Sequence, residues 1–200
     1  MIDVYNDILD NDVVDNFVNF ITSNDFKWYF NKDWSSQSEN DFANLSKNVI
    51  TTNQFVHIFT HNGEIRSDCF EMIKPIIKST LKGLNIKHCR VNRVKLNMML
   101  NDNEITENKY NVPHVDNYNT AEDSKTIIIY LSDSDGDTFF FNEKYIDKDV
   151  NTFTVLKRVT PKKGKMIVFD NNLYHASQNP IKSKTRLVIN ININSINYSN

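Results

Sequence analysis

Hydrophobic residues recur at intervals of three and four in two stretches of the first 85 positions. The first stretch follows Asp12 and contains Val13, Val14, Phe17, Val18 and Ile21. This spacing predicts a helix with one apolar side, and Asp12 is a residue type favoured at the N-cap. The second stretch, 67–84, contains Phe70, Ile73, Ile76, Ile77, Leu81 and Leu84. Gly83 lies at its end, and we expect this helix to pack on the outside of a sheet.

The periodicity changes to two after residue 86, which is typical of β-strands. In 87–100, one side carries Val91, Arg93, Lys95, Asn97 and Met99, and the other carries Asn92, Val94, Leu96 and Met98. A mainly polar side opposite an apolar one predicts a strand that borders solvent or a wet cavity. Residues 53–60 also have strand character. Further β-branched and aromatic segments follow at 126–132, 138–142, 152–159, 165–169 and 185–193.

Turn signals separate these segments, and no linker, repeat or change in composition divides the chain. The turns are expected at 133–136, 161–164 and 179–180, where Gly, Pro, Asp and Asn gather. Many short strands joined by such turns predict a sandwich or a closed barrel, including the jelly-roll type. We therefore expect one mainly β domain over 1–200, in which 1–85 provide flanking helices and strands and 86–195 form the core.

Composition and charge exclude several classes of protein. The chain is 40% hydrophobic with 13 Phe and 8 Tyr, which is typical of a folded domain. The net charge is −2 and no basic stripe occurs, so we expect no nucleic-acid partner. No apolar run reaches membrane-spanning length and the first residues lack signal-peptide character, so we expect no membrane association. Cys69 and Cys89 lack metal-ligand spacing, which predicts reduced thiols in a cytoplasmic protein.

The most informative polar residues are His114 and Asp116, which lie two positions apart. In a strand such residues point to the same side, so both can bind one metal ion. His175 follows an apolar segment and can supply a second imidazole. Two imidazoles and one carboxylate leave open positions that suit non-haem Fe(II) with a bidentate cosubstrate and O₂. Arg186 opens the last predicted strand, and a guanidinium can bind a dicarboxylate through a bidentate ion pair.

Four local sequences accompany these residues: PHVDN at 113–117, GDTF at 136–139, KGKMIVFDNNLYHAS at 163–177 and TRLVI at 185–189. Through them the chain resembles, over about 90–193, the Fe(II)/2-oxoglutarate-dependent dioxygenase superfamily, and within it the prolyl-hydroxylase-like branch. The resemblance implies a double-stranded β-helix core, which is jelly-roll and cupin-like. It also implies Fe(II), the cosubstrates 2-oxoglutarate and O₂, and a use for ascorbate.

The same resemblance implies roles for individual residues. The implied metal ligands are His114, Asp116 and His175. Arg186 is expected to pair with the distal carboxylate of 2-oxoglutarate, and Tyr130 is expected to share that carboxylate. Asn97, on the polar side of 87–100, is our candidate for lining the cosubstrate pocket.

The substrate side is less sharply defined by the sequence. Tyr110 is a candidate contact to cosubstrate or substrate, and Trp28, together with Trp34, is expected to shape the substrate entrance. Asn190 and Asn192 continue the side of Arg186 by period two. They either line the pocket or face solvent.

The implied reaction is oxidative decarboxylation of 2-oxoglutarate to succinate and CO₂, coupled to hydroxylation of a substrate C–H bond. A peptidyl prolyl residue is the substrate that the resemblance favours. One alternative is a hydroxylase of a free amino acid or small metabolite. A nucleobase demethylase would predict a basic groove and a second arginine after Arg186, and the sequence has neither. The alternative from another class is a non-catalytic, cupin-like module that binds a metal or a ligand.

Overall fold

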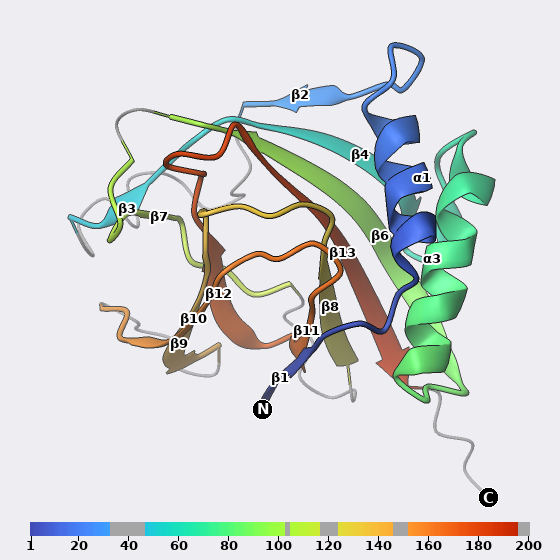
Figure 1. Cartoon of the computed structure of the whole chain (residues 1–200). Helices are drawn as coiled ribbons and strands as arrows, with labels where there is room; N and C mark the ends of the chain where they lie inside the picture. Colours follow the sequence, from blue (N-terminus) through green and yellow to red (C-terminus); the bar gives the residue numbers. More distant parts are fainter. Residues whose placement is uncertain (33–46, 103–104, 117–123, 146–151, 196–200) are drawn as a thin grey trace, which may run out of the picture.

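The computed structural model describes residues 1–32, 47–102, 105–116, 124–145 and 152–195 (Figure 1). Within the described residues of the N-terminal part lie two helices, α1 (Asn11–Ile21) and α3 (Phe70–Gly83). The strands of the N-terminal part are β1 (Ile2–Tyr5), β2 (Tyr29–Asn31), β3 (Val49–Ile50), β4 (Gln54–His61) and β5 (Glu64–Ile65). The remaining strands are β6 (Cys89–Leu100), β7 (Tyr110–Asn111), β8 (Ser124–Tyr130), β9 (Thr138–Lys144), β10 (Val155–Val159), β11 (Met166–Asp170), β12 (Leu173–Ser177) and β13 (Thr185–Ser195).

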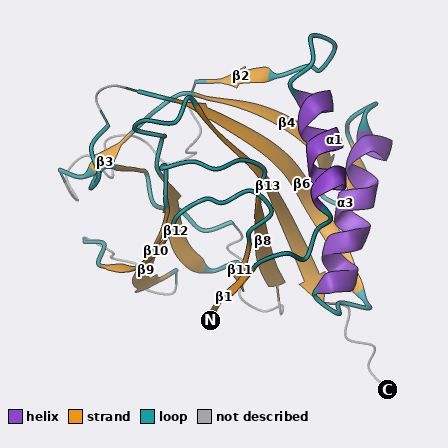
Figure 2. Cartoon of the chain, viewed as in Figure 1, coloured by secondary structure: helices purple, strands orange, loops and turns teal. Residues whose placement is uncertain are grey.

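Two antiparallel sheets form the core of the molecule. The major sheet has the order β1-β11-β8-β13-β6-β4-β2, and the minor sheet has the order β10-β9-β12. The helices cover one face of the major sheet, and the minor sheet lies toward its other face (Figures 1 and 2). This arrangement confirms the predicted mainly β class with N-terminal helices and a double-stranded β-helix core. Within the described residues, neither helix is long and apolar enough to cross a membrane.

The helices form where the apolar spacing predicts them, with one correction at the first N-cap. The N-cap of α1 is Asp10, whose side chain accepts a hydrogen bond from the backbone N–H of Asp12. The predicted cap, Asp12, instead lies inside the first turn, where a carboxylate favours the positive end of the helix dipole. In α3 the helix continues through Pro75 as one element.

The largest hydrophobic cluster lies between the helices and the major sheet. Its fully buried members include residues of both helices and of the central strands, for example Val14, Ile73, Leu96 and Ile189. This cluster fixes the apolar side of β6 and β13, because alternate side chains of a strand point to opposite faces. The polar side chains of the same strands therefore face the minor sheet.

A β-bulge in β6 changes the prediction for its first residues. Asn192 pairs with Arg93, but Ile193 pairs with Val91 and Asn194 with Arg90, so the register shifts by one residue at Asn92. Val91 consequently packs against the cluster beneath the helices. The predicted grouping of Val91 with Arg93 is therefore wrong, and Arg90 takes its place on the polar side. A bulge re-aims the side chains that precede it in this way.

The structure also contains a strand that the hydrophobic pattern did not predict. Leu173–Ser177 forms β12, with His175 at its centre opposite Phe140 of β9. The segment is short and follows two asparagines, so local propensity gave a weak signal. Its strand conformation comes from pairing with β9, which is a tertiary contact.

We expect the packing of β6 to dominate the stability of the sheet. Leu96 is 0% exposed, whereas Leu100 on the same strand is 45% exposed. Leu96→Ala should lower the free energy of unfolding by about 3 kcal/mol because it leaves a cavity in the core. Leu100→Ala is the matched control and should change it by less than about 0.5 kcal/mol. Urea denaturation followed by circular dichroism measures both values, and equal losses would contradict this account of the core.

Candidate metal and cosubstrate site

His114, Asp116 and His175 come together between the two sheets. The backbones of His114 and His175 form a β-bridge with two reciprocal N–H to O hydrogen bonds of 3.0 Å each. The two rings lie 4.4 Å apart between centroids. One ligand atom from each of the three residues lies within 4.8 Å of the others. The segment 114–116 and strand β12 thus place the three predicted ligands around one point.

The backbone also orients both imidazoles. Nδ1 of His114 lies 3.3 Å from the carbonyl oxygen of Val112, and Nδ1 of His175 lies 3.0 Å from that of Leu173. A proton on each Nδ1 is donated to these carbonyls and leaves Nε2 with its lone pair. Such second contacts are what orient metal-binding histidines in proteins.

The protonation states of the three side chains fit a divalent metal. Burial, and then the neighbouring His175, lower the pKa of His114 to about 3. Burial likewise lowers the pKa of His175. Both imidazoles are therefore neutral at pH 7, as metal binding requires. Two neutral imidazoles and a carboxylate are a donor set that suits Fe(II).

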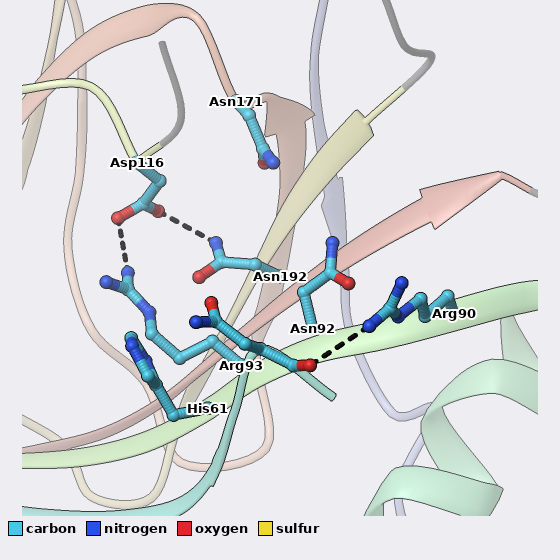
Figure 3. Close-up of a pocket in the computed structure, with 8 residues that line it drawn as sticks. His61, Arg90, Asn92, Arg93, Asp116, Asn171 and Asn192 are labelled. Carbon is cyan, nitrogen blue, oxygen red and sulfur yellow. Dashed lines mark hydrogen bonds and ion pairs between the residues drawn. The ribbon is translucent and has the colours of Figure 1, made fainter. Parts of the chain in front are cut away.

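Asp116 is held as a buried carboxylate by four neighbouring donors. Arg93 donates to Oδ1 at 2.7 Å, and Thr126 donates to Oδ2 at 2.7 Å. The amides of Asn190 and Asn192 donate to Oδ2 at 3.2 and 3.1 Å. Burial raises the pKa of Asp116, but the charge of Arg93 and the other neighbours outweigh it and hold this pKa well below its usual range. Figure 3 shows the contacts from Arg93 and Asn192.

These contacts answer the question that the sequence left open for the two asparagines. Asn190 and Asn192 face the site, and both contact Asp116. Arg93 and Thr126 have the same partner, although sequence reasoning did not single them out as site residues. The alternation of 87–100 placed Arg93 on the polar side of its strand. This was the feature of the sequence that could have identified Arg93 as a site residue.

Rows of paired residues across β6, β13 and β8 form the floor of the site. The rows are Met99–Arg186, Asn97–Val188–Tyr130, Lys95–Asn190–Ile128 and Arg93–Asn192–Thr126. Paired residues share one face of a sheet, so all of these side chains project toward the same side. Burial, with Arg93 beside it, lowers the pKa of Lys95 to about 8.

Arg186 lies at the other end of this floor and is 2% exposed. Its Nε donates to the carbonyl oxygen of Gly136 at 2.8 Å, and its terminal nitrogen donates to the hydroxyl of Thr138 at 2.7 Å. The hydroxyls of Tyr130 and Thr138 are 2.7 Å apart, and the guanidinium lies 5.7 Å from the centroid of the Tyr130 ring. One cation and two hydroxyls therefore converge, as recognition of a carboxylate requires. Thr138 was missed as a site residue, although it lies within the GDTF sequence.

The loop before β13 fixes the position of this arginine. A Cβ at Gly136 would lie 2.4 Å from the carbonyl oxygen of Gln178, so only glycine allows this close approach. The side chain of Asp135 accepts backbone hydrogen bonds from Ile181, Lys182 and Ser183 at 2.7–3.1 Å. Residues 135 and 136 thus tie the start of β9 to the segment that leads into Arg186.

The other three predicted site residues occupy different positions. Asn97 is half-buried on the floor, in one row with Val188 and Tyr130. Tyr110 packs against Phe139 and Phe141 in a separate hydrophobic cluster. His175 pairs with Phe140, whose side chain points to the opposite face of β9 from those of Phe139 and Phe141. Trp28 packs beneath the helices and donates to the carbonyl oxygen of Ile21 at 2.9 Å. The structure therefore brings Asn97 to the floor but not Tyr110 or Trp28, and Trp34 lies outside the described residues.

A cavity of about 390 Å³ opens beside Asp116 (Figure 3). Its lining contains Arg93 and Asn192 from the floor and Asn171 from the turn before β12. On the far side lie Arg90, Asn92 and the β4–β5 turn. This cavity gives a small molecule access to the carboxylate of the three-residue cluster.

Comparison with known proteins supports the assignment of this geometry. A model of the 2OG-Fe(II) oxygenase superfamily matches residues 98–194, which include the three-residue cluster and Arg186. No curated protein sequence matches the chain. Several solved structures do share its fold.

Among these structures, the non-haem α-ketoglutarate-dependent epimerase SnoN from nogalamycin biosynthesis is 14% identical, with a TM-score of 0.60 over 96% of this chain and 76% of that chain. The viral collagen prolyl hydroxylase of Paramecium bursaria Chlorella virus-1, in complex with 2-oxoglutarate, is 17% identical (TM-score 0.52, 98% and 96%). A prolyl hydroxylase from Trichoplax adhaerens is 13% identical (TM-score 0.57, 97% and 83%). At these identities the likeness is one of fold.

The buried imidazoles predict that the stability of the metal-free protein depends on pH. The pKa of His114 is about 3 in the fold, against 6.5 as its ordinary value. At a pH between these two values, His114 binds a proton in the unfolded chain but not in the folded one. The free energy of unfolding is therefore greatest above the ordinary pKa and decreases as the pH falls toward the pKa of the folded state. The slope from one such group is at most about 1.4 kcal/mol per pH unit.

Urea denaturation of the metal-free protein between about pH 7 and pH 5 measures this slope. The asparagine side chain of His114→Asn does not titrate, so this variant should show a shallower slope than the wild type, whatever its absolute stability. Equal slopes in the two proteins would contradict a neutral His114 in the fold.

Proposed function

We propose that this chain is a hydroxylase of the 2OG-Fe(II) oxygenase superfamily, whose members use Fe(II) and 2-oxoglutarate and whose model matches residues 98–194. In this proposal, oxidative decarboxylation of 2-oxoglutarate to succinate and CO₂ is coupled to hydroxylation of a substrate C–H bond. His114, Asp116 and His175 hold the metal, and Arg186 with Tyr130 binds the distal carboxylate of 2-oxoglutarate.

One observation carries the proposal, which is the position of two binding elements on one floor. The three-residue cluster contacts the row Arg93–Asn192–Thr126, and the carboxylate-binding group lies at the rows of Arg186 and Tyr130. A 2-oxoglutarate molecule has a keto acid at one end and a carboxylate at the other, so it needs both elements. The bound iron would supply the activation of O₂ at the positions that three protein ligands leave open.

The protein's own residues provide position and charge. Arg93, Thr126 and the two asparagines keep Asp116 ionised and restrict its orientation. The hydroxyl of Thr138 forms hydrogen bonds with both the guanidinium of Arg186 and the hydroxyl of Tyr130. Because these groups are buried and already hydrogen-bonded, little reorganisation is needed when the cosubstrate binds.

The substrate is a separate matter from the cofactors. Likeness to two prolyl hydroxylases supports a peptidyl prolyl substrate, but the same fold is found in a protein described as an epimerase. A shared fold is weak support for a shared substrate.

We also propose a cytoplasmic location for the protein. The free cysteines Cys69 and Cys89 support this location.

Two variants test the proposed roles separately. His175→Ala should abolish Fe(II) binding, because it removes one of three ligands. Arg186→Ala should keep Fe(II) binding and weaken 2-oxoglutarate binding by roughly 30-fold or more, since it removes the partner of a buried charge. Anaerobic calorimetry with Fe(II) and then 2-oxoglutarate measures both affinities, and Arg66→Ala, an exposed arginine outside the site, is the control.

Succinate formation under air completes this test. Wild-type protein that binds Fe(II) but neither binds 2-oxoglutarate nor forms succinate would contradict the proposal and support the non-catalytic, cupin-like alternative. An unchanged 2-oxoglutarate affinity in Arg186→Ala would contradict the assigned anchor.

A further inference from the structure

The cavity beside Asp116 has an unusual lining for a site that accepts a peptidyl proline. Apart from Asp116, its lining consists of two arginines, one histidine and four asparagines. No aliphatic side chain and no Phe, Tyr or Trp belongs to it among the residues that the structure describes. Ligand pockets for apolar groups are lined mainly by hydrophobic and aromatic side chains. The chemistry of this cavity therefore favours a polar ligand.

Arg90 reaches the cavity because of two local features of the backbone. The bulge at Asn92 turns Arg90 to the same side of the sheet as Arg93. The β4–β5 turn then places Asn62 and Gly63 in the left-handed region, with φ values of 54° and 79°. Arg90 donates to the carbonyl oxygen of Asn62 at 3.0 Å, and Gly63 donates to that of Asn92 at 2.9 Å.

The turn also leaves no space for a side chain beneath this guanidinium. A Cβ at Gly63 would lie 3.0 Å from Nε of Arg90. The carbonyl of Asn62 takes one of the five N–H donors of the arginine. The turn therefore fixes Arg90 at the cavity without using its full capacity to donate.

Two buried donors in the lining also have no acceptor. Nε of Arg93 and Nδ2 of Asn171 are buried, and neither has a hydrogen-bond partner among the described residues. Asn171 is 2% exposed as a whole residue. Buried donors without acceptors are rare in folded proteins and call for a ligand or water that satisfies them.

We propose that this cavity binds the carboxylate of a small, free acid, such as an amino acid or another organic acid, as the substrate of the hydroxylase. The proposal rests on the proposed function and names its substrate class. Two guanidiniums against one carboxylate give the lining an excess of one positive charge, and a metal on Asp116 would add to it. Guanidiniums bind carboxylates and phosphates through paired hydrogen bonds.

This substrate class differs from a prolyl residue within a peptide. Such a residue has neither a free carboxylate nor a charge, so it would leave the excess positive charge of the lining unmatched. The cavity of about 390 Å³ lies at the small end of the range for ligand pockets. Of the alternatives that the sequence left open, the free amino acid or small metabolite is thus the one that the lining favours.

The experiment uses full-length protein loaded anaerobically with Fe(II) and 2-oxoglutarate. A panel of free L-amino acids is titrated by calorimetry against the matching amino-acid amides, which lack the carboxylate. At least one free acid should bind. Its amide should bind with an affinity at least about tenfold lower. Inorganic phosphate and a neutral proline-rich peptide are the other probes. Binding of phosphate without binding of any free acid would overturn the carboxylate proposal. It would assign the same anion site to a phosphorylated metabolite.

Arg90→Gln is the variant that tests the residue assignment, because Arg90 is exposed and does not contact Asp116. It should weaken the free acid about tenfold or more. Arg66→Gln, an exposed arginine of the same region outside the cavity, should keep the wild-type affinity. Equal binding of acid and amide, an unchanged affinity in Arg90→Gln, or binding of the peptide alone would overturn the proposal. If the wild-type protein binds neither Fe(II) nor 2-oxoglutarate, this result would instead contradict the proposed function.

Discussion

The site depends on a charged group that is expensive to bury. The side chain of Asp116 is 3% exposed, and an isolated carboxylate in such a place would take up a proton. It stays ionised because Arg93 neutralises it and three uncharged groups complete its hydrogen bonds. These groups come from β6, β8 and β13, so the central strands of the major sheet must be in register before the carboxylate is stable.

The same strands carry two opposite demands, one on each face. Toward the helices they present Leu96, Ile189 and Ile191, which form a dry core. Toward the minor sheet they present Lys95, Asn190 and Asn192, which would be costly in a core. Alternation allows both faces on one backbone, because neighbouring side chains point in opposite directions. The helices therefore stabilise the site indirectly, by fixing which face of the sheet is dry.

The sequence predicted much of this arrangement, and the failures have physical causes. Strand and helix segments followed from periodicity, and the convergence of His114, Asp116 and His175 followed from residue types at characteristic spacings. Thr126 and Thr138 were not found, because a threonine in a strand has the same local signature whether it packs or binds. Trp28 packs against the main hydrophobic cluster, and aromatic residues near the start of a domain serve in cores as readily as at entrances. The pairing of β12 with β9 depends on residues 29 to 39 positions apart in sequence, which a local pattern does not report.

The bulge at Asn92 has a consequence for how such a protein can change over time. The pairing register decides which residue faces the cavity from this end of β6. The extra residue in the bulge, Asn92, brings Arg90 rather than Val91 to the cavity side. Insertion of a single codon between Arg90 and Val91 would move Arg90 away from the cavity side, without any substitution and without altering the floor from Arg93 onward. Ligand preference in this scaffold can therefore diverge through short insertions at a strand end, while the three-residue cluster and Arg186 keep their positions.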